Sequence, residues 1–245
     1  MREAPTSLDA WLGGRLQLCQ PAKGHRAGTD AALLVAASPD ARRVIDVGAG
    51  VGAVGLAMLA LGRAQTMQLV EIDPWLADLA SGNARRNGLA ADIRRADTLK
   101  PASRRAAGLV DAAADLVVTN PPFLAAGAVR ASPDAGRARA HVMADGGLGA
   151  WIKACAALLA PGGRLVMIHR AEALAEILAI CDGRLGGLAI RPVQPQPSAP
   201  ANRLLVAGVK GSRAPLTLLP ALVLHEATGA FTAQAEALHR GEARL

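Results

Sequence analysis

A glycine-rich loop directly after a short apolar run is the feature that most constrains the fold of this chain. The run Arg43–Val47 has the character of a buried strand, and it leads into Gly48, Gly50 and Gly52 before a helix-like segment at 51–61. Glycine lets the backbone turn tightly and approach a ligand, because no Cβ stands in the way. A strand, a glycine loop and a helix in this order are typical of nucleotide-binding α/β folds. A purely structural turn is the alternative interpretation.

Strand-like and helix-like segments alternate along the rest of the chain. We predict strands at 43–47, 66–72, 92–96, 115–119, 164–169, 189–193 and 204–209, and helices at 51–61, 74–87, 148–159 and 171–181. This order predicts an α/β fold, a doubly wound and mostly parallel sheet of seven strands with helices on both faces.

The segments outside this alternation are predicted to be accessory. The proline-rich stretch 192–200 should link the last two strands, since proline does not sit inside a central strand. We expect one domain over 1–245, in which the segments 1–41 and 211–245 pack onto the core 42–210. Neither segment is long enough to form a good core of its own.

The composition is that of a folded protein and limits the partners. There are 27 Lys and Arg against 20 Asp and Glu, which gives a formal charge of +7, and 51% of the residues are apolar. The positive charge permits a polyanionic partner such as RNA but does not require one. Aromatic residues make up only 2%, so a platform of several stacked bases is excluded.

The same composition bears on metals and on location. Cys19, Cys155 and Cys181 are far apart, so we expect no structural metal site and no disulfide framework. The N-terminus lacks the apolar core of a signal peptide, and no apolar run is long enough to span a membrane. The expected location is therefore the cytoplasm, without a membrane partner.

Three acids stand at the ends of three consecutive predicted strands, namely Asp46, Glu71 and Asp97. The carboxyl ends of neighbouring parallel strands line one crevice, and a carboxylate there can accept both hydroxyls of a ribose. Asp97 could face an adenine. Asp46 lies beside the glycine loop, where it would repel a pyrophosphate and suit an ammonium group or an ordered water. The acids therefore favour a cationic nucleoside over NAD.

The tetrad Asn120-Pro121-Pro122-Phe123 follows the fourth predicted strand and reaches the same crevice. Two prolines fix the backbone and remove two N–H donors, which leaves carbonyl acceptors. Asn120 adds a side-chain acceptor, and Phe123 adds a flat apolar face. The tetrad is therefore suited to accept hydrogen bonds from an amino group and to stack a planar ring. Considered alone, it could also be a rigid turn.

Together these motifs resemble those of class I S-adenosylmethionine-dependent methyltransferases that methylate amino groups. The similarity covers roughly residues 8–210. The segment 21–31, with Gly28, Thr29 and Asp30, and the tail 229–232 resemble the bacterial tRNA adenine-N6 methyltransferases that act beside the anticodon of a valine tRNA. The resemblance implies S-adenosylmethionine as the cofactor, held by Asp46, Gly48, Gly50, Gly52, Glu71, Asp97 and Asn120, with Gly28 and Thr29 nearby.

The resemblance also implies the reaction, transfer of a methyl group to an exocyclic amine with Asn120, Pro121, Pro122 and Phe123 as the catalytic residues. The leading interpretation of the acceptor is N6 of an adenine in tRNA. Phe123 replaces the tyrosine frequent in adenine methylators, so guanine N2 in RNA and the amide of a protein glutamine remain alternatives. A non-catalytic nucleotide-binding module and an NAD-dependent oxidoreductase are interpretations from other classes, and neither uses the tetrad.

Basic residues on either side of these motifs predict where RNA would bind. Arg130, Arg137 and Arg139 come after the tetrad, and Lys23 and Arg26 precede the Gly-Thr-Asp segment. Contacts from such side chains to phosphates position RNA without reading its sequence. For any one of them a solvated surface side chain is the alternative. The sequence does not indicate an oligomeric state.

Overall fold

The computed structural model describes residues 5–24, 26–122 and 147–245. Its strands are β1 (Thr6–Trp11), β2 (Leu16–Pro21), β3 (Ala41–Val47), β4 (Ala64–Glu71), β5 (Asp92–Arg95), β6 (Ala114–Thr119), β7 (Leu159–Arg170), β8 (Leu185–Gln194), β9 (Arg203–Lys210), β10 (Thr217–Leu218) and β11 (Leu222–Val223). Its helices are α1 (Thr29–Ala37), α2 (Ala53–Ala60), α3 (Pro74–Arg86), α4 (Pro101–Ala106), α6 (Gly147–Leu158), α7 (Leu174–Cys181) and α8 (Ala233–His239), with a short 3₁₀ turn, η1 (Ala171–Ala173).

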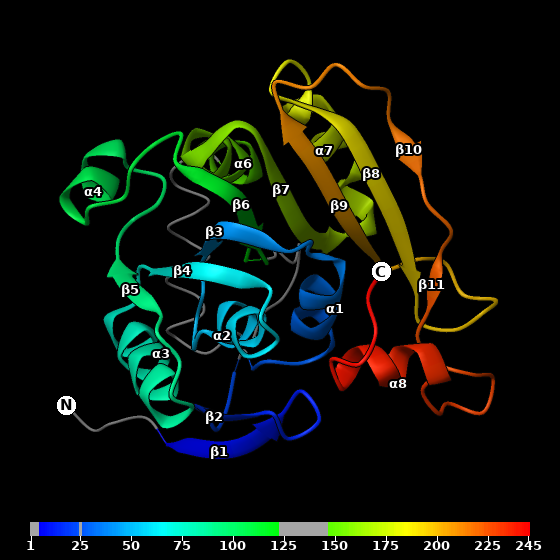
Figure 1. Cartoon of the computed structure of the whole chain (residues 1–245). Coiled ribbons are helices and arrows are strands. Elements are labelled where there is room, and N and C mark those ends of the chain that lie inside the picture. Colours follow the sequence, from blue (N-terminus) through cyan, green and yellow to red (C-terminus); the bar gives the residue numbers. More distant parts are fainter. Residues whose placement is uncertain (1–4, 25, 123–146) are drawn as a thin grey trace.

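The central sheet has the strand order β10-β8-β9-β7-β6-β3-β4-β5, with β11 also beside β8 (Figure 1). The run from β5 to β7 is parallel, and β9 lies antiparallel between β7 and β8. The seven predicted strands are therefore confirmed as the body of a mostly parallel sheet. The two-residue strands β10 and β11 extend its edge.

The order of the strands places a crevice in the middle of this sheet. The chain moves outward from β3 through β4 to β5, and β6 then returns to pair with the other side of β3. Where the winding reverses, the connections leave in opposite directions, and a crevice opens beyond the carboxyl ends of the two strands. The strand order therefore predicts a crevice between the ends of β3 and β6.

Helices cover both faces of the sheet, as predicted. Successive residues of a strand point to opposite faces, so Val44 and Leu116 lie in one apolar core while Ile45 and Val117 lie in the other. The first core includes residues of α1, α2, α3 and α8, and the second includes residues of α6 and α7. No helix of the described ranges is long and apolar enough to cross a bilayer.

The proline-rich stretch differs from its prediction as a pure linker, because Pro192 pairs with Leu204 inside the ladder between β8 and β9. The carbonyls of Ile190 and Gln194 both accept N–H groups from the outer segment that contains β10 and β11. Pro192 alternates in phase with these two residues, so the side that lacks an N–H faces outward. A proline is tolerated there because the inner ladder to β9 does not need its donor.

The N-terminal segment contains an antiparallel hairpin, β1–β2, that the sequence did not predict. Two asparagines of α3 bind the backbone of β2 as a neighbouring strand would. Asn83 accepts the N–H of Cys19 at 2.7 Å and donates to the carbonyl of Cys19 at 2.9 Å. Asn87 makes the same pair of hydrogen bonds with Gln17, both at 2.9 Å. Four residues of a helix and two residues of a strand both advance about 6–7 Å, so the spacing of the two asparagines along α3 equals the spacing of Cys19 and Gln17 along β2. Asn83 also donates to the carbonyl of Val51 at 3.0 Å, so the hairpin is tied to the glycine loop.

The C-terminal segment returns to the first helix. In α8, His239 Nδ1 donates to the carbonyl oxygen of Ala235 at 2.7 Å, and its Nε2 is hydrogen-bonded to the Thr29 hydroxyl at 3.0 Å. Phe231 stacks on His225 and tilts against His239, with ring centroids 4.5 Å apart in both pairs. The tail motif around Phe231 therefore supports α1 at the residue next to Gly28.

Candidate active site

The glycine loop turns sharply at the end of β3. Gly48, Gly50 and Gly52 all have positive φ angles, of 72°, 57° and 84°, a region that side chains with a Cβ rarely adopt. The N–H groups of Gly48 and Ala49 both donate to the carbonyl of Val70, at 2.9 and 3.0 Å. Among the described residues, a Cβ on Gly50 would meet nothing within 4 Å, whereas one on Gly52 would lie 3.0 Å from a methyl group of Leu69. Gly50 therefore borders open space, and Gly52 lies against packed side chains.

Asp46 is buried beneath this loop, with 2% of its surface exposed. Its Oδ2 accepts the N–H of Gly55 in the first turn of α2 at 3.0 Å. Burial raises the pKa of Asp46 to about 7, the Gly55 N–H acts in the opposite direction, and the nearby Glu71 adds to the rise. In this position the carboxyl group anchors the start of α2. Its expected contact with a ligand ammonium remains a prediction.

Glu71 ends β4 and holds the loop from the other side. Its Oε2 accepts the N–H of Gly50 at 2.8 Å, and its Oε1 accepts the N–H of Asp73 at 2.8 Å. Burial raises the pKa of Glu71, against the lowering effect of these N–H groups. Each carboxylate oxygen has a second acceptor site. The side chain can therefore shape the loop and still accept the two hydroxyls of a ribose.

Asp97 follows β5 on the next strand outward. Its Oδ1 accepts the N–H of Leu99 at 3.1 Å, and its Oδ2 pairs with Lys100 at 3.0 Å. Its side chain is 12% exposed. The structure therefore places Asp97 in a local turn at the rim of the same edge as Asp46 and Glu71, and its contact with an adenine remains a prediction.

Asn120 stands across the crevice from the glycine loop, directly after β6. Its Oδ1 is buried and has no hydrogen-bond partner among the described residues. Pro121 is buried and Pro122 is half-buried. A buried polar atom without a partner costs free energy, so native proteins keep few of them. An acceptor held ready in this way fits a donor supplied by a ligand.

A pair of residues that the sequence analysis did not single out supports both sides of the crevice. The Trp151 indole N–H donates to the Thr119 hydroxyl at 3.0 Å, and that hydroxyl donates to the carbonyl of Val47 at 2.8 Å. The sequence signal was a tryptophan in a predicted helix of a chain with few aromatics. Its contact with the end of β3 depends on the tertiary fold.

The other predicted site residues have mixed positions. Gly28 is the N-cap of α1, and Thr29 begins that helix. Lys23 is exposed, whereas the guanidinium of Arg26 pairs with Asp9 at 2.7 Å and donates to Ser7 at 3.0 Å. The predictions for the following four residues lie outside the described residues: Phe123, Arg130, Arg137 and Arg139.

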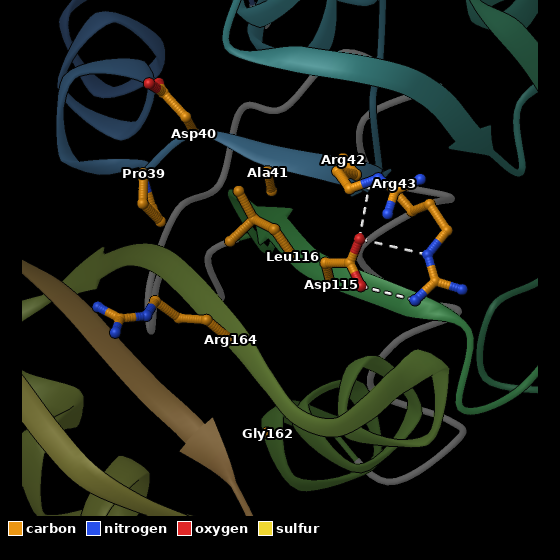
Figure 2. A pocket seen from close by; sticks show the side chains of 9 residues that line it. All are labelled: Pro39, Asp40, Ala41, Arg42, Arg43, Asp115, Leu116, Gly162 and Arg164. Carbon is orange, nitrogen blue, oxygen red and sulfur yellow. Dashed lines mark hydrogen bonds and ion pairs between the residues drawn. The ribbon is translucent and has the colours of Figure 1, made fainter.

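A cavity of about 710 Å³ lies at the opposite edge of the sheet, where β3 and β6 begin (Figure 2). Asp115 accepts from the Arg43 backbone N–H at 3.0 Å and from its guanidinium at 2.6 and 3.2 Å, and this pairing lowers the pKa of Asp115. These contacts tie the amino ends of the two strands together. The cavity therefore lies at the amino ends of β3 and β6, whereas the three acids and Asn120 lie at the carboxyl ends of the strands.

No group of three His, Cys, Asp or Glu side chains within the described part of the chain could hold a metal ion. The crevice is instead lined by the glycine loop, with open space beside Gly50 among the described residues, and by two acceptors, the carboxylate of Glu71 and the unsatisfied oxygen of Asn120. These groups fit the ribose and the neighbouring atoms of a nucleoside cofactor.

Comparison with known proteins defines the class. The profile of the methyltransferase small domain family matches residues 25–179. The chain belongs to this family, and it is an S-adenosylmethionine-dependent methyltransferase.

Particular relatives share most of the chain. A tRNA1(Val) (adenine(37)-N6)-methyltransferase from Aeromonas hydrophila is 32% identical over 187 residues, which cover 74% of this chain and 75% of the relative. The protein of the same name from Porphyromonas gingivalis is 30% identical over 220 residues and covers 84% of each chain.

Solved structures agree on the fold. A predicted O-methyltransferase from Agrobacterium tumefaciens superposes with a TM-score of 0.73 at 34% identity, over 88% of this chain and 98% of that one. A 16S rRNA N2 G1207 methyltransferase from T. thermophilus, solved with AdoMet and guanosine, superposes with a TM-score of 0.59 at 20% identity, over 84% of this chain and 50% of that one.

Proposed function

We propose that this enzyme methylates N6 of an adenine in tRNA, with Asn120 holding the amino group. The single observation that carries this proposal is the buried Oδ1 of Asn120, which has no hydrogen-bond partner among the described residues. The names of the relatives from Aeromonas hydrophila and Porphyromonas gingivalis support adenine in tRNA as the acceptor. An RNA acceptor also implies that the enzyme works in the cytoplasm, and this location is part of the proposal.

The chemical demand on the protein comes from the acceptor. S-adenosylmethionine supplies a methyl group on a sulfonium, which is already an activated electrophile. The exocyclic amine is a poor nucleophile, because its lone pair is delocalised into the ring. Asn120 Oδ1 and the carbonyl of Pro121 are the acceptors we assign to the two amino hydrogens. Holding both hydrogens turns the lone pair out of the ring plane toward the methyl group, so position and electrostatics provide the rate enhancement.

Glu71 and the glycine loop have the complementary task of binding the cofactor. The carboxylate of Glu71 is oriented by the N–H groups of Gly50 and Asp73 before any ligand arrives. A preoriented acceptor loses little freedom on binding. We assign the ribose hydroxyls to Glu71, and we assign Asp97 and Thr29 to the rim of the cofactor site. Phe123 and the arginines at 130, 137 and 139 keep their proposed roles in stacking the base and contacting phosphates.

A methyl-transfer assay tests the proposal. Tritiated S-adenosylmethionine is incubated with unmodified bulk tRNA, with ribosomal RNA and with protein extract, and the labelled RNA is digested to nucleosides. Label in N6-methyladenosine from tRNA is expected. Label in N2-methylguanosine, in a 2′-O-methylnucleoside or in protein would replace adenine as the acceptor while keeping the enzyme class.

The role of Asn120 has its own test. We expect Asn120→Ala to abolish turnover and to leave the affinity for S-adenosylhomocysteine, measured by calorimetry, near that of the wild type. A large loss of cofactor affinity would instead mean that Asn120 has a structural role or acts on the cofactor.

A further inference from the structure

Beneath the crevice, one side chain touches both of the segments that must face each other across it. Trp151 lies in the first turns of α6 and is 8% exposed. A Cβ built on Gly48 would lie 3.0 Å from Cζ2 and 3.1 Å from Cη2 of the six-membered ring of Trp151. The ring therefore packs directly on the first glycine of the cofactor loop.

The same side chain is bonded to the other segment. Its Nε1–H donates to Thr119 Oγ1 at 3.0 Å, and Thr119 is fully buried. The Thr119 hydroxyl donates in turn to the carbonyl of Val47 at 2.8 Å. An indole nitrogen is only a donor and a carbonyl is only an acceptor, so the direction of both hydrogen bonds is fixed.

The position of these contacts along the strands gives them their importance. Val47 and Thr119 are the last register pair of β3 and β6, so the two strands separate immediately afterwards. The next residues are Gly48 on one side and Asn120 on the other. Any change in the separation of the strand ends therefore moves the cofactor loop relative to Asn120, the side chain to which we assign the hydrogen bond from the amine.

We propose that Trp151 and Thr119 are positioning residues that fix the separation between the glycine loop and Asn120. Both strand ends are held in two ways, by hydrogen bonds through Thr119 and by the ring against Gly48. The proposal rests on the proposed function only for the identity of the acceptor, because the separation matters for methyl transfer to any amine in this crevice. Transfer requires reacting atoms within a narrow range of positions, and a displacement of about 1 Å can lower a rate by ~100-fold.

Conservative variants separate this role from simple packing. Trp151→Phe keeps a ring against Gly48 and removes the N–H. Thr119→Val keeps the shape and removes both hydrogen bonds, while Thr119→Ser restores the hydroxyl. Trp11→Phe, in the hairpin strand β1, is the matched tryptophan control.

Steady-state kinetics with the acceptor that the wild type methylates give the first readout. We expect Trp151→Phe and Thr119→Val to lower kcat by about 10- to 100-fold, with KM for S-adenosylmethionine and the affinity for S-adenosylhomocysteine changed less than about threefold. Thr119→Ser and Trp11→Phe should retain wild-type kcat. In the double variant the two losses should not multiply, because both changes break one relay. An unchanged kcat, or a loss that only parallels the loss of cofactor affinity, would overturn the proposal.

Amide hydrogen exchange gives a second readout that needs no acceptor, so it remains decisive if the acceptor is not tRNA. With S-adenosylhomocysteine bound, peptides covering 44–52 and 114–122 should exchange about tenfold faster in Thr119→Val than in the wild type, as expected for a local opening that has become easier. Peptides from β8 and β9 should not change. Strand-end peptides that exchange at the wild-type rate, or a uniform increase over the whole protein, would contradict a positioning role at this crevice.

Discussion

Replacing Asp46 by asparagine should change how the stability of the enzyme depends on pH. Asp46 is 2% exposed, and burial raises its pKa to about 7 from an ordinary value of 3.8. The asparagine side chain would have nearly the same shape and could still accept the N–H of Gly55 through its amide oxygen, but it would not ionise. The substitution therefore isolates the cost of a buried charge from the contribution of the hydrogen bond.

The sign follows from the direction of the shift. The folded protein binds the Asp46 proton more tightly than the unfolded chain does, so this group contributes stability at low pH that is lost as the pH rises from about 3.8 to about 7. The difference between these pKa values, at ~1.4 kcal/mol per pKa unit, corresponds to a total of about 4 kcal/mol. About 3 kcal/mol of this change falls between pH 5 and pH 8.

Urea unfolding of the cofactor-free wild type and of Asp46→Asn at pH 5, 6, 7 and 8 measures this effect. The free energy of unfolding of Asp46→Asn minus that of the wild type should rise by about 3 kcal/mol across the series. His169, whose pKa is lowered by burial, titrates in both proteins and cancels in the difference. The charge of Glu71 contributes to the raised pKa of Asp46, so the measured change includes the coupling between these two carboxyl groups. A difference that stays constant with pH would refute the claim that burial destabilises the ionised form of Asp46.

Four further substitutions test the cofactor site, the docking of the hairpin and the packing of α2. Glu71→Gln cannot accept the N–H groups of both Gly50 and Asp73, so the affinity for S-adenosylhomocysteine should fall by about 10- to 100-fold in calorimetry, the equivalent of a lost charged hydrogen bond. Unchanged affinity would remove Glu71 from the cofactor site. Asn83→Ala leaves three backbone groups without their partner, so urea unfolding should show a loss of about 2–4 kcal/mol, and a loss under about 0.5 kcal/mol would contradict the docking described. Gly55→Ala would place a Cβ 2.3 Å from a methyl group of Leu69, so it should lower the free energy of unfolding by about 1–3 kcal/mol. Its control, Gly82→Ala on an open face of α3, should raise the free energy of unfolding by about 0.5–1 kcal/mol. The midpoints of thermal unfolding should therefore shift in opposite directions, and shifts of equal sign would argue against the tight packing of α2 on β4.

The sequence predicted the parts of the site that depend on local chemistry. Glycines with positive φ angles are needed where the chain turns at the end of β3, and Gly48, Gly50 and Gly52 occupy those positions. Glu71 follows an apolar strand, so its position at the edge of a parallel sheet was predictable from the alternation of strands and helices. The side chain of Asn120 was predicted as an acceptor beside two prolines that lack N–H donors, and its burial became visible only in the fold.

The features that the sequence did not reveal depend on contacts between distant segments. Asn83 and Asn87 read as ordinary polar residues of a helix, and only the fold brings them to the backbone of β2. The hairpin itself is short, and its outer strand alternates only weakly between exposed and half-buried residues. Trp151 is far from Gly48 along the chain, so no local pattern could indicate their contact. Pro192 lies inside a strand, although proline was expected only in a linker, because the side of β8 that lacks its N–H faces away from β9.

A crystal structure with S-adenosylhomocysteine and the RNA acceptor identified by the transfer assay would show how Asn120 and Glu71 meet the two substrates. The acceptor amine should lie in the crevice between β3 and β6, with its nitrogen about 3 Å from Asn120 Oδ1. The ribose hydroxyls of S-adenosylhomocysteine should be bound by Glu71. An amine turned away from Asn120, or a base bound outside this crevice, would rule out the proposed role of Asn120.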